Sequence, residues 1–180
     1  EDTSDKLIKY LIKNKHWSPL EMVNVCLEIE TTRDIARQIL RHRSFSFQEF
    51  SQRYADPTKD MEFVTREARL QDSKNRQNSV ALDSDDDLHV AWKIKQLSII
   101  HECKLAYNWA IDNGIAKEQA RVVLPEGLTM SRMYMNGTLR SWVHYIELRT
   151  ANGTQKEHME IAKYCAFEIA KIFPLMNEII

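Results

Sequence analysis

The sequence contains only four glycines and three cysteines among its 180 residues. None of the glycines forms a GxGxxG or Walker loop, so a glycine-rich phosphate cradle is absent. The cysteines, Cys26, Cys103 and Cys165, are odd in number, widely separated and outside any CxxC pattern. This argues against a disulfide framework or a zinc site and indicates a reducing compartment. We therefore expect a cytoplasmic protein that holds no metal.

Long apolar runs and an excess of charge of one sign are also missing. No apolar run reaches the roughly 18 residues that a membrane span needs. The first residues, Glu1-Asp2-Thr3-Ser4-Asp5, are acidic, unlike those of a signal peptide. The formal net charge is -1, so any anion site must come from local clusters rather than a global basic field. We expect neither a membrane nor a nucleic acid as partner.

Hydrophobic residues make up 43% of the chain and charged residues 28%, a balance typical of one globular domain with a core. The patterns predict an α+β fold, with a central mixed or antiparallel sheet and flanking helices in a single domain spanning residues 1–180. Helices are expected at 4–15, 32–42, 84–112, 116–122, 138–149 and 155–172, and strands at 23–29, 45–53 and 128–135.

Local signals refine this prediction. Thr32 and Thr138 are expected to cap their helices, and Ser84 with the aspartates that follow is expected to start the longest one. The broad apolar face of helix 84–112 suits either a core or an interface. Asn136-Gly137 is a strong turn signal, and residues 55–80 are expected to form a long ordered loop with one short helix.

The densest group of functional residue types lies between Arg41 and Tyr54. Arg41-His42-Arg43 ends a predicted helix, where the helix dipole favours cations, and this is one explanation of the triplet. If 45–53 is extended, alternate side chains face one way and form a polar row that could bind a small ligand. Those side chains are Phe45, Phe47, Glu49, Ser51 and Arg53. Ser51 is either a nucleophile or, because no general base is assigned, a hydrogen-bonding residue.

Other polar groups are open to two interpretations. His16, Ser18 and Glu21 either form a local helix cap with a surface histidine or are free for other work, since a strand follows them. Arg140, His144 and Leu148 share one helix face. Arginine forks suit phosphate and the edges of planar rings. Residue types alone therefore predict binding of a phosphorylated, planar ligand.

Four segments resemble motifs of the flavin-dependent thymidylate synthases, in the order of that family. Arg41-His42-Arg43, seven residues and then Ser51 match its signature, which Gln52-Arg53-Tyr54 extends. His16–Glu21, Ala120–Pro125 and Leu139–Arg149 resemble its upstream, middle and C-terminal motifs. Family members usually begin with a further strand and helix that carry a flavin-contacting serine, and this chain starts at what resembles the helix after them.

The resemblance implies an enzyme that makes dTMP from dUMP with FAD as cofactor. It implies methylenetetrahydrofolate as carbon donor, NADPH as reductant, hydride delivered through FAD, and a homotetramer with shared sites. Arg149 is implied as the catalytic residue at the uracil, where its charge stabilises developing electron density. The implied dUMP set is Gln38, Arg41, Glu49, Ser51, Gln52, Arg53, Arg121 and Arg149. The implied FAD set is His16, Ser18, Glu21, His42, Arg43, Ser44, Arg140, His144 and Leu148.

Two other functions compete with this interpretation. One is a non-catalytic nucleotide- or phosphate-binding module that kept the arginine cluster. The other is a nucleic-acid binder that uses Arg33, Arg37, Arg41 and Arg43. The net charge of -1 and the acidic start of helix 84–112 disfavour the second, which would require a steeply salt-dependent affinity.

Overall fold

A computed structural model of the chain describes residues 3–83 and 86–179 and confirms the predicted α+β class. The chain divides into two units, each assembled from separate segments of sequence. Unit 1 comprises Glu1–Ile29, Gln38–Gln48 and Tyr134–Ile180, and unit 2 comprises Glu30–Arg37 and Glu49–Met133. That the chain acts as a single domain stays a prediction.

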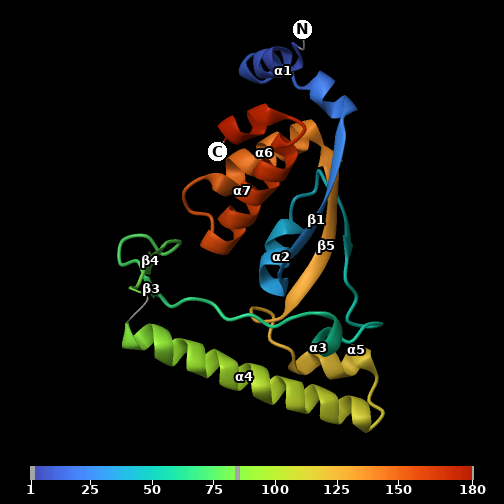
Figure 1. Ribbon diagram of the computed structural model, residues 1–180, viewed down its shortest axis with the longest axis vertical. Coiled ribbons are helices and arrows are strands. Elements are labelled where there is room, and N and C mark those ends of the chain that lie inside the picture. Colours follow the sequence, from blue (N-terminus) through green and yellow to red (C-terminus); the bar gives the residue numbers. More distant parts are fainter. Residues whose placement is uncertain (1–2, 84–85, 180) are drawn as a thin grey trace. The chain divides into compact units, whose positions relative to one another are not determined.

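A three-stranded sheet in the order β1-β5-β2 consists of β1 (Asn24–Thr32), β5 (Met130–Thr138) and β2 (Ser46–Glu49) (Figure 1). The amide of Leu139 donates to the carbonyl of Val23, and the amide of Arg33 donates to that of Thr129. Residue numbers therefore rise along β1 while they fall along β5, so this pair is antiparallel. The sheet fits the predicted central antiparallel arrangement.

The helical elements with residues in unit 1 are α1 (Ser4–Lys13), the 3-10 turn η1 (Ser18–Met22), the end of α2 (Arg33–Ile39), α6 (Leu139–Thr150), α7 (Lys156–Ala170) and η3 (Pro174–Glu178). α6 packs against α7 (Figure 1). The hydroxyl of Thr138 accepts a hydrogen bond from the Ser141 amide at 3.2 Å, which confirms the predicted cap. The buried indole of Trp142 donates to the carbonyl of Val25 at 3.0 Å and holds α6 against β1.

Asn136-Gly137 lies inside β5, so the predicted turn is wrong. The glycine serves packing instead, because a Cβ at Gly137 would lie 2.4 Å from Cδ1 of Phe45. The buried Phe45 ring meets Trp142 and Tyr145 edge to face, with centroid separations of 4.9 and 5.9 Å. Glycine thus lets an aromatic cluster lie directly on the strand.

Two other predicted elements are shorter than expected. The helix predicted over 32–42 is Arg33–Ile39, and Thr32 ends β1 with its hydroxyl donating to the Asp34 carboxylate at 2.6 Å. The strand predicted over 45–53 ends at Glu49, so its extension through Ser51 is wrong. The Ser51 carbonyl accepts from the amides of Tyr54 and Ala55, which turns the chain. The alternation of side-chain types in the sequence continues past Glu49, although the backbone is no longer an extended strand there.

The other elements of unit 2 are α3 (Pro57–Asp60), β3 (Arg69–Gln71), β4 (Ser79–Ala81), α4 (Asp87–Asp112), α5 (Lys117–Ala120) and η2 (Arg121–Val123). β3 and β4 form an antiparallel hairpin, so the prediction that 55–80 is a loop with one helix is wrong in part. Three-residue strands are too short for alternation to reveal them. The start of α4 is capped by Asp86, which accepts from Leu88 at 2.8 Å. Ser84 and Asp85 lie outside the described residues.

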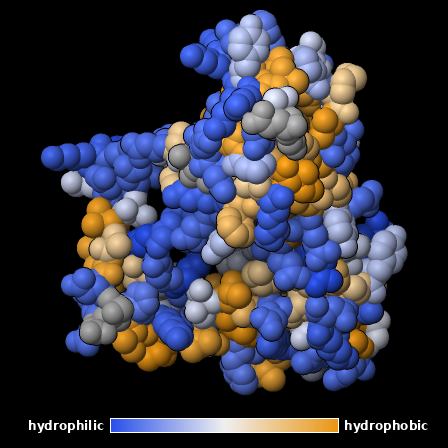
Figure 2. Space-filling model, turned by 45° about the horizontal axis from the view of Figure 1, so that its top comes forward, coloured by the Kyte–Doolittle hydropathy of each residue, from blue (hydrophilic) through white to orange (hydrophobic). Residues whose placement is uncertain are grey.

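The predicted apolar face of α4 is largely exposed in this chain. Only Gln96, Cys103, Tyr107 and Ala110 of this helix are buried. Its exposed apolar side chains are Leu88, Val90, Trp92, Ile94, Leu97, Ile99, Leu105 and Trp109. Figure 2 shows hydrophobic side chains at the surface in the lower part of the view, where α4 lies. Among the described residues, no helix has both the length and the apolarity needed to cross a membrane.

The Gly137 contact leads to a prediction about stability. Gly137→Ala should lower the free energy of unfolding by about 1–3 kcal/mol, because the new methyl group overlaps the Phe45 ring. Urea denaturation measures this difference. Gly127→Ala is the matched control, since its methyl group would meet its nearest neighbour at an ordinary 3.6 Å. Equal effects at the two glycines would contradict the packing role of Gly137.

Candidate functional site

Unit 1 contains a cavity of about 640 Å³. Its lining residues are Glu21, Met22, Ser44, Thr138, Arg140, Ser141 and His144. They come from η1, from the segment between α2 and β2, and from the start of α6 with its cap. The volume is within the range of about 300–1,000 Å³ that is usual for small-molecule sites. Four members of the predicted FAD set, Glu21, Ser44, Arg140 and His144, thus line one cavity.

The chemistry of this lining suits an anionic ligand that carries a flat ring. Arg140 Nη1 lies 2.6 Å from Glu21 Oε1, and both side chains are half-exposed. The hydroxyls of Ser44 and Ser141 and the N-terminal end of α6 add donors and positive dipole, which favour phosphate. The ring of His144 lies against that of Trp17, with centroids 4.4 Å apart. These groups fit FAD, which has both a pyrophosphate and planar rings.

The other predicted FAD residues do not line this cavity. Ser18 begins η1, and the His16 ring meets Tyr10 edge to face with centroids 5.9 Å apart. Arg43 and Leu148 are exposed.

His42, the last member of the predicted FAD set, contacts Arg149 instead. Arg149 Nε donates to His42 Nε2 at 2.9 Å, so this imidazole acts as an acceptor and must be neutral. Burial, together with the nearby charge of Arg149, lowers the pKa of His42 to about 4. No ion pair joins Arg149 to a carboxylate anywhere in 3–83 or 86–179. No carboxylate among the described residues therefore neutralises the guanidinium, whose positive charge can act on a ligand.

A second imidazole, which the sequence did not predict as a functional residue, lies close to the first, with ring centroids 6.3 Å apart. His158 is fully buried on α7, and its Nε2 lies 3.0 Å from the hydroxyl of Tyr145. Its Nδ1 lies 3.1 Å from Oε1 of Gln38, a predicted dUMP residue. Burial, and then the charge of Arg149 nearby, lower the pKa of His158 to about 3. The residue has no motif around it, and the four residues before it are polar, so the sequence gives no local signal of its burial.

The predicted dUMP set divides between the units. Gln38, Arg41 and Arg149 belong to unit 1, as does the whole FAD set, whereas Glu49, Ser51, Gln52, Arg53 and Arg121 belong to unit 2. Arg41 is exposed and forms no ion pair within the described part of the chain.

In unit 2, Glu118 brings two of the predicted dUMP residues together. Its carboxylate lies 3.2 Å from Arg53 Nη2, and its carbonyl accepts from Arg121 Nε at 3.3 Å. Both partners of the Arg53 pair are about half-exposed, so the pair is weak and open to exchange for an anionic ligand. Gln52 is 4% exposed, and its amide nitrogen has no hydrogen-bond partner among the described residues.

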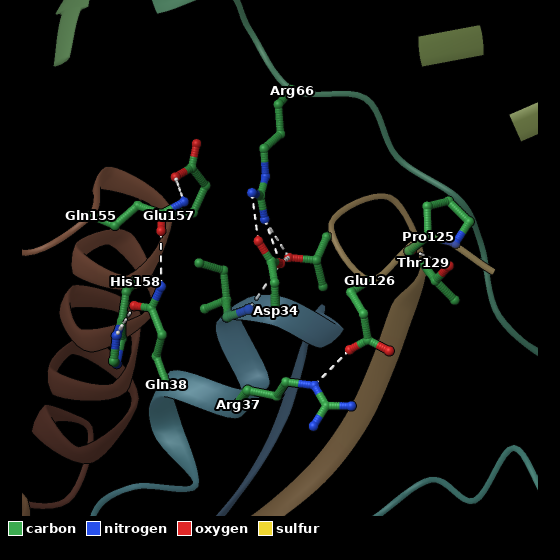
Figure 3. Close-up of polar contacts among 12 residues, drawn as sticks. Asp34, Arg37, Gln38, Arg66, Pro125, Glu126, Thr129, Gln155, Glu157 and His158 are labelled. Atoms are coloured by element: carbon green, nitrogen blue, oxygen red, sulfur yellow. Dashed lines mark hydrogen bonds and ion pairs between the residues drawn. The ribbon is translucent and has the colours of Figure 1, made fainter. Parts of the chain in front are cut away.

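The other two predicted residues of unit 2, Ser51 and Glu49, already have partners within the protein. The Ser51 hydroxyl accepts from the Arg53 amide at 3.4 Å, and Glu49 is held by two side chains. Its Oε1 accepts from the Ser131 hydroxyl at 2.9 Å and lies 3.4 Å from Arg33 Nη1. Arg33 and Arg37 both pair with Glu126, at 3.2 and 2.7 Å (Figure 3 shows the second pair). These neutralised arginines no longer offer the bare basic face that the nucleic-acid hypothesis requires.

A second ion pair of unit 2 is structural. Arg66 holds the Asp34 carboxylate with two nitrogens at 2.7 Å and donates to Thr32 (Figure 3). Burial opposes ionisation of Asp34, but the hydrogen bonds from Arg66 and Thr32 outweigh it and lower the pKa of this carboxyl. The pair fixes the segment around Arg66 to the start of α2, and the charge of Arg66 is locally neutralised.

The fold and the lining of the unit 1 cavity suit the class of proteins that bind anionic ligands with flat rings. A family model described as thymidylate synthase complementing protein matches residues 1–175. A probable flavin-dependent thymidylate synthase of Paramecium bursaria Chlorella virus 1 is 48% identical over 172 residues, covering 96% of this chain and 78% of the relative. A flavin-dependent thymidylate synthase of Synechocystis sp. is 49% identical over 170 residues, with 94% and 76% covered. The chain therefore belongs to the flavin-dependent thymidylate synthase family, an enzyme family, and the resemblance found in its motifs is confirmed.

Solved structures give the same fold. A UMP/dUMP methylase from Streptomyces cacaoi, bound with 5-Br UMP, matches with a TM-score of 0.83 and 28% sequence identity. The match covers 99% of this chain and 83% of that chain. A structure of the same methylase bound with 5-Br dUMP matches with a TM-score of 0.82 and 25% identity.

The neutral imidazoles lead to a prediction about pH. The pKa of His42 in the folded protein, about 4, lies below its ordinary value of 6.5, so between these values the unfolded chain binds more protons. The stabilisation from neutral His42 should be complete above about pH 6.5 and fall as the pH drops toward 4. His42→Gln keeps an acceptor for Arg149 but cannot titrate. Denaturant titrations from pH 7 to pH 4 should show a shallower loss in this variant, and equal slopes would contradict the assignment.

Proposed function

We propose that this chain is a flavin-dependent thymidylate synthase that converts dUMP to dTMP. The observation that carries the proposal is Arg149, held by the neutral imidazole of His42 and free of any carboxylate partner within the described residues. A guanidinium held in this way can stabilise electron density that develops on a uracil ring. The names of the relatives and the nucleotides bound to the solved methylase support this substrate class.

The residues of unit 1 have separate tasks in this proposal. Arg140, Ser44 and His144 would hold FAD at the cavity, with Glu21 fixing Arg140. When bound, FAD supplies hydride transfer. Arg149 would polarise the uracil, and the remaining FAD residues complete the cofactor contacts. Those are His16, Ser18, His42, Arg43 and Leu148.

The nucleotide is proposed to be held by arginines and by hydrogen-bonding side chains. The proposed residues are Gln38, Arg41, Glu49, Ser51, Gln52, Arg53 and Arg121. Methylenetetrahydrofolate is proposed as carbon donor, and NADPH as reductant, through FAD.

The assembly and location are also proposed. The many exposed apolar side chains of α4 support a homotetramer with shared sites, because apolar surface left exposed on a protein is a feature of protein interfaces. The two units would work as one functional domain. Cys26, Cys103 and Cys165 are free thiols, which supports the reducing environment of the cytoplasm.

The proposal is tested on the purified full chain with FAD. The protein should show a flavin absorption band that changes when dUMP is added. It should form dTMP from dUMP, methylenetetrahydrofolate and NADPH. A protein that binds dUMP but forms no dTMP under these conditions would support the non-catalytic nucleotide-binding module instead.

Arg149 should be needed for turnover and dispensable for folding. Arg149→Ala should lower kcat by about 10²–10³-fold, the usual effect of removing one group that stabilises developing charge. Arg76→Ala, at an exposed arginine between β3 and β4, is the control and should leave kcat unchanged. Steady-state dTMP formation and thermal melting measure the two properties. Unchanged dTMP formation by Arg149→Ala would reject the catalytic assignment.

Ser51 should bind rather than attack. Ser51→Ala should raise the Kd for dUMP by about 3–10-fold, the effect of one lost hydrogen bond, while turnover at saturating dUMP persists. Titration of the flavin band with dUMP gives the Kd. Complete loss of chemistry at saturating dUMP would restore the interpretation of Ser51 as a nucleophile.

A further inference from the structure

A chain of hydrogen bonds links Gln38 of α2 to the start of α7, within unit 1 (Figure 3). The Gln38 amide nitrogen lies 2.9 Å from Oε1 of Gln155, and its Oε1 lies 3.1 Å from Nδ1 of His158. Gln155 Nε2 lies 2.9 Å from the Glu157 carboxylate. At the other end, His158 Nε2 lies 3.0 Å from the hydroxyl of Tyr145.

One carboxylate sets the direction of every hydrogen bond in this chain. The ionised Glu157 side chain only accepts, so the nitrogen of the Gln155 amide faces it and the oxygen faces Gln38. Gln38 must then donate to Gln155 through its nitrogen and turn its oxygen to His158. His158 consequently carries its proton on Nδ1, and its Nε2 accepts from Tyr145.

The burial of His158 makes this arrangement hard to reverse. The side chain is fully buried, so its two nitrogens depend on protein partners alone. Turning the Gln38 amide over would place oxygen against the Gln155 oxygen and nitrogen against the donor nitrogen of His158. The hydrogen bond to Gln155 would then be lost whichever nitrogen of His158 carries the proton, and the bond to His158 would survive only if the imidazole moved its proton to Nε2.

We infer that His158, Gln155 and Glu157 are positioning residues that fix which end of the Gln38 amide donates and which end accepts toward the nucleotide. The inference rests on the proposed function, in which Gln38 binds dUMP. One N–H of Gln38 is used by Gln155 and one lone pair by His158. The second N–H and the second lone pair remain for a ligand, each on a fixed side of the amide. The three residues act through Gln38 and not on the reacting atoms.

Two substitutions of His158 separate this role from simple packing. His158→Leu replaces the imidazole with an apolar side chain of similar size and so removes the donor to Gln38. It should raise the Kd and KM for dUMP by about 3–10-fold, the range expected for one hydrogen bond, with kcat changed less than about threefold. His158→Asn places an amide nitrogen near the position of Nδ1 and should restore the Kd to within about threefold of the wild-type value.

A second pair of variants tests the direction of the chain. Glu157→Gln replaces a pure acceptor by an amide that can donate or accept, so the orientation of Gln155 and Gln38 is no longer fixed. The Kd for dUMP should rise by about threefold or more. Glu160→Gln, at an exposed position of the same helix, is the matched control and should leave the Kd unchanged. If His158→Leu does not fold, the comparison of Glu157→Gln with Glu160→Gln tests by itself whether Gln155 and Glu157 orient Gln38.

The inference is overturned if His158→Leu, folded and with unchanged melting temperature, binds dUMP as tightly as the wild type. It is also overturned if His158→Asn binds as weakly as His158→Leu, or if Glu157→Gln matches its control. A wild-type protein that binds no dUMP would reject the proposed function instead. The hydrogen-bond chain then still has its own test, because histidine ¹⁵N spectra at pH 7 should show a proton on Nδ1 of His158. A proton on Nε2 of His158 would overturn the inferred direction of the hydrogen-bond chain.

Discussion

The hydrogen bond from Arg149 to an uncharged His42 is the interaction on which the candidate site of unit 1 depends. Burial and the guanidinium together keep the imidazole neutral, so it holds the arginine without cancelling its charge. A carboxylate in that place would fix the side chain equally well but would compete with an anionic or electron-rich ligand. Packing places this pair, since the Phe45 ring lies on Gly137 and meets Tyr145 of the helix that carries Arg149.

The carboxylates distinguish two groups of arginines. In unit 2, Arg33 and Arg37 pair with Glu126 and Arg66 pairs with Asp34, which stabilises local structure. In unit 1, Arg41 and Arg149 have no such partner among residues 3–83 and 86–179. The net charge of -1 conceals this division, because it averages over neutralised and uncompensated groups. The half-exposed pairs of Arg140 with Glu21 and of Arg53 with Glu118 stay open to exchange for an anionic ligand. The local surroundings of each arginine, and not the total charge, thus indicate where an anion can bind.

Much of the candidate site could be predicted from the sequence, because its residues stand in motifs. The supporting residues could not. Gln155, Glu157 and His158 look like ordinary positions around a helix start, and nothing local indicates that they orient Gln38. The predicted extended backbone at Ser51 was wrong for a related reason. Its side chain continues the alternation of β2, but hydrogen bonds to its carbonyl have already turned the backbone.

The sequence by itself determined the features that depend on near neighbours: the alternation of β1, the cap at Thr138, the order of the motifs and the α+β class. Only the tertiary structure decided that Gly137 serves packing and not a turn, and that His42 holds an arginine 107 residues away. It also decided the direction of the Gln38 amide, whose partners lie 117 and 120 residues along the chain. The physical reason is that an amide, an imidazole or a glycine has no fixed role of its own, and the groups that fold against it assign one.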